Sequence, residues 1–220
     1  MIGRLAIMLV ALLPEATAVA SPQMRVFAES GNIVLERGAA RTRLTSSGRD
    51  SDPVLSPTRT FVVFTRQTNP SRDYSPGEGC ETAAGDELRR IGVDGSGESV
   101  LLRGRIGTPK SQLCVFSDKQ FNSDGQRLYF LTRGWALEEA LHVYSFRTHV
   151  SGFVRAASDV MVLRSCQGRY KDALVLLEHR YFVFGGSYDW YWVYDATGTR
   201  ELGPLGESAH AAEQECEDLQ

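Results

Sequence analysis

The stretch RLTSSGRDSDPVLSPTRTFVVFTR, residues 43–66, contains the pattern that decides the fold. A polar cluster of Ser, Gly and Asp leads to a tight turn at Ser56-Pro57, and a strongly β-prone run, Thr60–Thr65, follows. Proline suits the first central position of such a turn because its φ angle is already set. The stretch therefore predicts that the chain enters the core, reverses sharply and returns as a buried antiparallel strand.

The same pattern occurs a second time further along the chain. FNSDGQRLYF, residues 121–130, matches LSPTRTFVVF, residues 55–64, in register. Each copy has an apolar residue, a polar turn and a strand that ends in Phe. In the second copy Asp124-Gly125 supplies a side-chain acceptor and a residue that tolerates positive φ. The repetition predicts successive antiparallel strand pairs.

A second kind of turn recurs at a spacing that suits a repeated sheet. Asp- or Gly-containing turns lie near residues 38, 96, 149 and 197, which are 58, 53 and 48 residues apart. Helix signals are almost confined to the Ala- and Glu-rich stretch Glu207–Leu219. The sequence therefore predicts an all-β fold, a small or incomplete β-propeller of about four four-stranded blades. The expected strands include Leu113–Phe116, Arg127–Thr132, Tyr181–Phe184 and Trp190–Tyr194.

These motifs resemble the repeat of TolB-like β-propellers, where R-L-T precedes D-P-x-x-S-P-D-G-K and a strand ending in aromatic-x-R. The first copy has Thr58 and Arg59 where Asp-Gly is usual, and the second has Asn122-Ser123 in place of Ser-Pro. The resemblance extends over residues 32–205 and implies loops on one face that contact envelope proteins. The matching residues are Arg43-Leu44-Thr45, Asp52-Pro53 and Ser56-Pro57 in the first copy, and Asp124-Gly125 in the second.

The way in which the ring of blades would close is left open by the sequence. Residues 32–45 are typical of the two outer strands of a blade, and three fuller blades follow. Three arrangements are compatible with this pattern: residues 24–30 supply a further strand and the ring closes, the ring stays open, or a partner completes it. An open ring would leave unpaired sheet edges, which proteins rarely tolerate.

The first 20 residues have the features of a secretory signal peptide. Arg4 precedes the apolar run Leu5–Leu13, Pro14 follows, and Ala18-Val19-Ala20 offers small residues for cleavage after Ala20. Nine apolar residues are too few for a membrane span, which needs about 20. The expected product is a single periplasmic or secreted domain, residues 21–220, with an inserted loop at 68–85 and a tail at 207–220.

Charge and motif content argue against several functional classes. The 220-residue chain has a net charge of −3, which is unsuited to nucleic-acid binding, and removing Arg4 and Glu15 with the leader leaves it unchanged. Neither H-E-x-x-H nor G-x-S-x-G occurs. We therefore expect no catalytic residues, metal or cofactor, and we expect structural roles for His142 and His149.

Four cysteines remain after the predicted cleavage, an even number that favours disulfides in an exported protein. Of the three possible connectivities, the favoured one pairs Cys80 with Cys114 and Cys166 with Cys216. The first bond would tether the inserted loop. Buried free thiols are the alternative.

The segment FGGSYDWYWVYD, residues 184–195, concentrates aromatic side chains. On a strand, Tyr188, Trp190, Trp192 and Tyr194 share one face. Large rings there either fill the wedge between blades or form an exposed binding surface. Tyr181, Tyr188 and Trp190, beside the Gly185-Gly186 reversal, are expected to reach solvent. The predicted function is binding of an envelope protein, with carbohydrate or small-ligand binding through residues 181–194 as the alternative.

Overall fold

The computed structural model describes residues 23–68, 86–209, 212 and 216, which form four antiparallel sheets in chain order. The predicted leader, nearly all of the inserted loop and most of the tail lie outside the described residues. The first sheet contains β1 (Met24–Glu29), β2 (Asn32–Arg37) and β3 (Ala40–Arg43). The second contains β4 (Asp50–Leu55), β5 (Phe61–Gln67), β6 (Asp86–Gly92) and β7 (Ser99–Arg103).

The third and fourth sheets repeat the up-and-down order of the second. The third contains β8 (Ser117–Phe121), β9 (Arg127–Thr132), β10 (Glu139–Ser145) and β11 (Val150–Ala157), and the fourth contains β12 (Asp159–Leu163), β13 (Ala173–Tyr181), β14 (Ser187–Tyr194) and β15 (Glu201–Gly206). A short 3-10 turn, Gly168–Tyr170, lies between β12 and β13. No described helix is long and apolar enough to cross a membrane.

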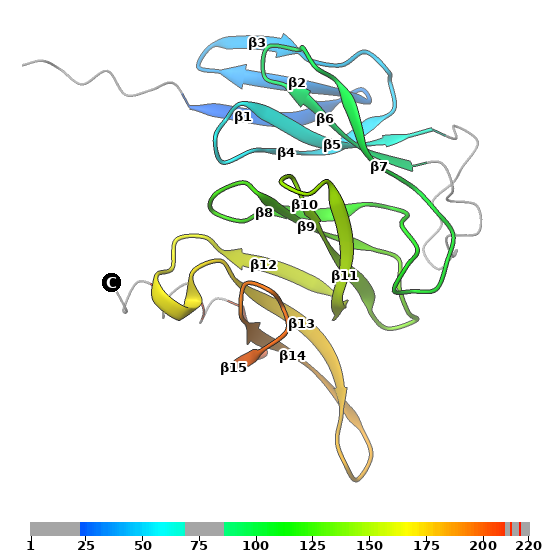
Figure 1. Cartoon of the computed structure of the whole chain (residues 1–220), viewed down its shortest axis with the longest axis vertical. Helices are drawn as coiled ribbons and strands as arrows, with labels where there is room; N and C mark the ends of the chain where they lie inside the picture. The colour runs from blue at the N-terminus through cyan, green and yellow to red at the C-terminus, as the bar shows by residue number, and fades with distance from the viewer. Residues whose placement is uncertain (1–22, 69–85, 210–211, 213–215, 217–220) are drawn as a thin grey trace, which may run out of the picture.

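The sheets follow one another as successive blades of an incomplete propeller (Figure 1). The inner strands β4, β8 and β12 contact each other in sequence, and β1 contacts β4. Among the described residues, the first and fourth sheets lie at opposite ends and share no paired strands. The predicted fold class is therefore confirmed. Residues 24–30 do supply a further strand, β1, as one of the three arrangements requires. The first sheet still has one strand fewer than the others.

The apolar run in β5 is continuous because both faces of this strand are buried. Val62 and Phe64 pack against Ile33 of the first sheet. Val63 points the opposite way and packs against Phe130 of the third sheet. Side chains alternate between the two faces of a strand, so a strand between two neighbouring sheets needs apolar residues at every position.

The second strands of the later sheets repeat this double burial. On β9, Leu128 and Phe130 face the second sheet, whereas Tyr129 and Leu131 face the fourth. On β13, Leu174 and Leu176 pack toward the third sheet. The intervening Ala173 and Val175 belong to a cluster on the outer face of the fourth sheet, together with residues of the tail.

The two matching turns have the same hydrogen-bond pattern. The Arg59 amide donates to the Ser56 carbonyl at 2.8 Å, and the Gly125 amide donates to the Asn122 carbonyl at 3.1 Å. The Ser56 hydroxyl accepts from the Phe61 amide, as the Asn122 side chain accepts from the Arg127 amide. Arg59, with φ +56°, takes the positive φ that Gly125 adopts at +71°.

One expected strand is wrong. Leu113–Phe116 is buried, but only Leu113 makes a bridge, with Arg105, and the inner strand β8 begins at Ser117. The apolar run is a core-filling connection, while the more polar Ser117–Phe121 is the strand. In addition, β13 runs without interruption to Tyr181, and residues 182–184 lie in the following loop.

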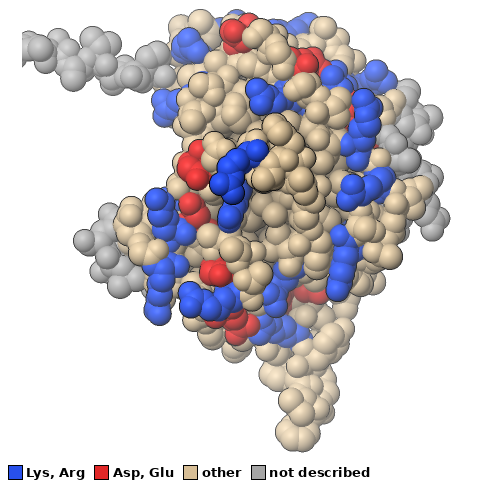
Figure 2. All heavy atoms as spheres, in the orientation of Figure 1, with Lys and Arg blue, Asp and Glu red and all other residues tan. Residues whose placement is uncertain are grey.

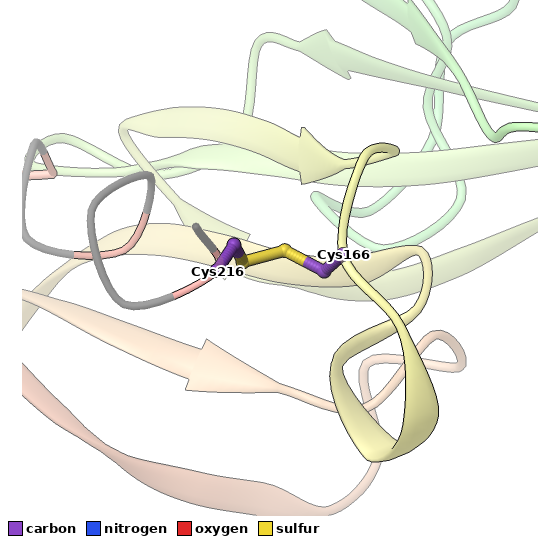
Figure 3. The surroundings of a disulfide bond; sticks show 2 residues. All are labelled: Cys166 and Cys216. Carbon is purple, nitrogen blue, oxygen red and sulfur yellow. A yellow bond between two sulfur atoms is a disulfide. The ribbon is translucent and has the colours of Figure 1, made fainter. Parts of the chain in front are cut away.

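The disulfide between Cys166 and Cys216 is confirmed (Figure 3). It links the connection after β12 to the tail, and both cysteines are buried in the cluster on the outer face of the fourth sheet. Ala212 and Cys216 in the tail are helical. Cys114 is buried, whereas Cys80 lies outside the described residues, so their pairing stays a prediction.

We expect Gly31→Ala to destabilise the fold more than Gly95→Ala. Both glycines have positive φ, +70° and +82°, so alanine is strained at either position. A Cβ at position 31 would lie 2.1 Å from the Gly48 carbonyl oxygen, whereas nothing lies within 4 Å at position 95. Gly95→Ala should lower the free energy of unfolding by about 1 kcal/mol and Gly31→Ala by at least about 3 kcal/mol, measured by urea denaturation. Equal losses would contradict this close approach.

Candidate functional site

The most prominent surface feature is the hairpin formed by β13 and β14. β12 pairs with β13 only as far as Leu177, and β15 pairs with β14 only from Tyr191. Beyond these points the two strands continue as a two-stranded ribbon that projects from the body of the molecule (Figure 1). The reversal is closed by the Phe182 amide, which donates to the Gly186 carbonyl at 3.0 Å. Gly185 and Gly186 adopt φ values of +99° and +87°.

The end of this ribbon, which we call the hairpin tip, consists of the exposed apolar residues Tyr181, Phe182, Val183 and Phe184. Val183 is 92% exposed and Phe184 is 101% exposed, as much as in an extended chain. The tip contains no Lys, Arg, Asp or Glu, and Figure 2 shows the projection as an uncharged lobe. A contiguous exposed apolar group of this kind is typical of a contact surface.

The aromatic face of β14 changes from core to surface along the strand. Tyr194 and Trp192 are buried in the cluster between the third and fourth sheets, and the half-buried Tyr188 packs against that cluster. Trp190, 37% exposed, lies between Trp192 and Tyr188, with its ring 5.1 Å from that of Tyr188. The wedge-filling and exposed roles considered for this segment thus apply to different residues of one strand.

The structure brings the three predicted binding residues onto one ribbon. Tyr181 and Trp190 are exposed, whereas Tyr188 is partly covered by Phe182, whose ring lies 4.7 Å away. Val183 and Phe184 are the most exposed large apolar residues of the described chain, and with Phe182 they lie within residues 181–194 but are not among the three predicted binding residues. The signal that identifies them is an apolar run directly before two glycines, because such a run at a reversal lacks neighbours on either face.

Charged residues fix the base of the ribbon. The buried Glu178 carboxylate pairs with Arg155 at 2.7 Å and with Arg180 at 2.7 Å. Arg180 also pairs with Glu201 at 2.7 Å, and its guanidinium lies 3.5 Å from the centroid of the Trp192 ring. These contacts join β11, β13, β14 and β15, so they hold the ribbon in one direction relative to the sheets.

The protonation states at this base are set by burial and by the paired charges. Burial lowers the pKa of Arg180, but hydrogen bonds to Glu201 and Glu178 more than offset this and hold it above its usual value. Burial raises the pKa of Tyr194, and the adjacent Glu178 carboxylate raises it further. Tyr194 therefore keeps its proton and donates it to Glu178 at 3.0 Å.

An open cleft of about 430 Å³ lies beside the base of the ribbon. Its walls combine rings with charges: Trp135 and Phe153 meet edge to face at 6.0 Å, and the Lys110 ammonium lies over Phe153. Glu178 and His179 of β13 complete one side of the cleft. Rings next to carboxylates and cations can bind a polar ligand such as a sugar through stacking and hydrogen bonds.

His142 and His149 have structural surroundings. His142 is buried against Phe130, and burial together with the charge of Arg105 lowers its pKa to about 4, so it is uncharged at neutral pH. His149 bonds to the Tyr144 hydroxyl at 3.2 Å. Within the described part of the chain, no group of three or more His, Cys, Asp or Glu residues is arranged to hold a metal ion.

No family profile matches the sequence, and no curated protein matches it either. Several solved structures share its fold. TolB from Acinetobacter baumannii is 12% identical with a TM-score of 0.52, over 86% of this chain and 41% of its own. A puromycin-hydrolyzing peptidase from Mycobacterium tuberculosis is 14% identical with a TM-score of 0.52, over 87% of this chain and 30% of its own.

A third similar structure is an oligogalacturonate lyase in complex with manganese, 12% identical with a TM-score of 0.50, over 77% of this chain and 40% of its own. The chain thus spans less than half the length of each of these proteins. At such low identity the three structures support the β-propeller fold and nothing finer, because one fold serves many functions.

We expect Arg180→Ala to loosen the base of the ribbon. The substitution removes the pairing with Glu178 and Glu201 and uncovers the Trp192 ring. The free energy of unfolding should fall by about 2 kcal/mol, and tryptophan emission should shift to longer wavelength. Arg169→Ala, which removes an exposed guanidinium stacked on Tyr170, is the matched control and should change neither quantity measurably. Identical behaviour of the two variants would refute the bracing role of Arg180.

Proposed function

We propose that this chain is an exported, non-catalytic β-propeller-like protein that binds another protein in the bacterial cell envelope through the hairpin tip. The observation that carries the proposal is the exposure of four consecutive apolar residues at the end of a projecting ribbon. Their apolar surface is left in water in the free chain, so covering it with a partner releases free energy. Fully burying one such side chain is worth about 1.5–3 kcal/mol.

The construction of the ribbon supports recognition of a protein. The tip is held by backbone hydrogen bonds across the reversal and by the ion pairs at its base, so little conformational freedom is lost on binding. Rigid aromatic anchors of this kind dominate many protein interfaces. A groove lined by apolar residues is the complementary surface expected on the partner.

Export is supported by features outside the ribbon. The Arg4, Leu5–Leu13 and Ala18-Val19-Ala20 pattern is that of a cleavable leader. The disulfide between Cys166 and Cys216 suits an oxidising compartment such as the periplasm. The resemblance to TolB-like repeats agrees with an envelope location.

We expect the double variant Val183→Ser, Phe184→Ser to lose its partner. The tagged protein would be crosslinked in its native envelope and captured, and the amount of specifically crosslinked partner measured. Loss of two buried anchors should weaken the complex by at least about tenfold, equivalent to 1.4 kcal/mol. The free energy of unfolding should stay unchanged, because both side chains are solvent-exposed in the free chain.

The matched control is Ile106→Ser, Val150→Ser, which removes two exposed apolar side chains elsewhere on the surface. It should capture as much partner as the unmodified chain. Equal capture by the tip variant and this control would rule out the tip as the binding surface.

The cleft beside Trp135 favours a second candidate function, binding of a carbohydrate or another small polar ligand. It predicts that tryptophan fluorescence changes on titration with oligosaccharides and that Trp135→Ala abolishes the change. This response, combined with unaltered capture by the tip variant, would replace the protein-binding proposal with the ligand-binding one.

We expect the exported protein to begin at Ser21. Intact-mass measurement of the protein from the periplasm or medium should give the mass of residues 21–220, reduced by two hydrogens for each disulfide. Substitution of Ala18 and Ala20 by Arg should leave the uncleaved precursor, because signal peptidase requires small residues there. Retention of residues 1–20 in the unmodified exported protein would contradict the assigned cleavage site.

A further inference from the structure

The first sheet lacks the strand that occupies the innermost position in the other three sheets. β4, β8 and β12 each form one edge of a four-stranded sheet and contact one another along the inside of the arc. β1 begins the three-stranded first sheet and pairs only with β2. Asn32 at the start of β2 accepts from the Gly48 amide, as Asp86 at the start of the third strand β6 accepts from the Val115 amide. β2 therefore corresponds to a third strand and β1 to a second strand, which has no inner neighbour among the described residues.

The direction of the β1 backbone groups follows from its pairing with β2. A two-residue turn, Ser30-Gly31, with φ values of +50° and +70°, joins Glu29 to its partner Asn32. Such turns are flanked by a hydrogen-bonded pair, and hydrogen-bonded and non-bonded pairs then alternate. Arg25, Phe27 and Glu29 therefore bond to β2, while the amides and carbonyls of Met24, Val26 and Ala28 point away from it. Within the described chain, these outward groups have no bonding partner.

The inner strands of the other three sheets do not present such an edge. The Gln120 side chain donates to the Val160 carbonyl at 2.6 Å and accepts from the Val162 amide at 3.0 Å, so it occupies the free edge of β12 as a neighbouring strand would. β4 and β8 are each interrupted by a register shift. Asp52 lies in the shift of β4 and Lys119 in the shift of β8, and the two side chains bond to each other. Shifts and bonded side chains are recognised ways of blocking an edge.

The outermost strands are protected as well. β7, β11 and β15 each have a register shift against their neighbour, and β15 contains Pro204. β3 has only four residues, two of them Arg. β1, in contrast, pairs with β2 over six residues without a shift, and it contains neither Pro nor Lys. Among the described strands, β1 thus has the edge best suited to pairing with another strand.

The length of chain before β1 limits what can fill this place. In the second sheet, the inner strand begins at Asp50 and the next strand begins at Phe61, so about ten residues form the strand and its turn. Cleavage after Ala20 would leave Ser21–Gln23 in front of β1. Three residues cannot reverse and form a strand, so in the mature protein the residues that precede β1 are too few to fill this place.

We propose that the free edge of β1 binds an extended segment of a partner protein, which adds the missing inner strand by main-chain hydrogen bonding. The inference rests on the export and cleavage proposed above, and it names a second contact surface besides the hairpin tip. The segment runs antiparallel to β1, as β4 runs to β5.

The side chains of β1 set the chemistry of this segment. Met24 and Val26 face the core formed with Ile33, Leu35 and Leu55. Arg25 and Glu29 lie on the opposite, exposed face. The added strand therefore has apolar residues at alternate positions, toward the core, and polar residues between them.

The test uses a chain that begins at Ser21 and a synthetic peptide of residues 158–164, SDVMVLR, which contains an inner strand of this fold, as the probe strand. Amide hydrogen exchange is measured by NMR with and without excess peptide. We expect exchange at Met24, Val26 and Ala28 to slow by at least about tenfold. Arg25, Phe27 and Glu29, already bonded to β2, should be unaffected. Absence of this alternating protection would overturn the proposal.

A pair of variants at Ala28 distinguishes edge pairing from adhesion to the surface. Ala28→Pro removes one outward amide and leaves the bonds to β2 intact, and Ala28 is exposed, so the core is unchanged. It should abolish protection at Met24 and Val26. Ala28→Ser, which keeps the amide, should behave as the parent. Peptide binding that survives Ala28→Pro would refute pairing at the edge.

If something other than a partner occupies the β1 edge, the outward amides of β1 are already protected from exchange before any peptide is added. Protection of the outward amides in the full chain of 220 residues, but not in the chain beginning at Ser21, would assign the edge to the protein's own leader and overturn the partner proposal. Protection that increases with protein concentration would assign it to a second copy, with the same consequence. The Val183→Ser, Phe184→Ser variant should retain peptide protection, so failure at the tip and failure at the β1 edge are separable.

Discussion

Burial of both faces of the second strands is the constraint on which the architecture depends. Val62 and Phe64 pack against the sheet before them and Val63 against the sheet after them, and β9 repeats this arrangement. Such strands are stable only between two neighbouring sheets, so each sheet requires the next. The fourth sheet has no following sheet among the described residues, and its outer face is covered by Ala212 and the Cys166–Cys216 bond.

Main-chain polar groups impose a second constraint, which acts along the inside of the arc. A buried amide or carbonyl without a partner is destabilising, so the inner edges of the sheets have to be satisfied or interrupted. Gln120 does this for β12 by imitating a peptide group, and the buried Lys119 bonds to the Phe116 carbonyl and the Thr65 hydroxyl. β1 has neither device, and so the missing strand is a local feature of the first sheet.

The parts of the fold that follow from local chemistry could be predicted from the sequence. Ser56 and Asn122 each satisfy their own turn, and the recurring outer turns are hairpins, because these contacts lie within a few residues. The strand β8 could not be predicted, since its buried Lys119 is stabilised by Asp52 and Thr65, more than 50 residues earlier. Likewise, the apolar sequence of residues 182–184 is typical of a core strand. Its exposure could not be predicted, because it depends on where β12 and β15 stop pairing with the ribbon.

The ribbon and the β1 edge lie at opposite ends of the described fold (Figure 1). A two-stranded ribbon is only marginally stable alone in water, and here Glu178 and Arg180 at its base supply the missing support. That support comes from the third and fourth sheets, whereas the β1 edge depends on the first and second. The two surfaces are therefore built independently, and a compact partner bound at one leaves the other open. The two proposed contacts are therefore sterically compatible with each other.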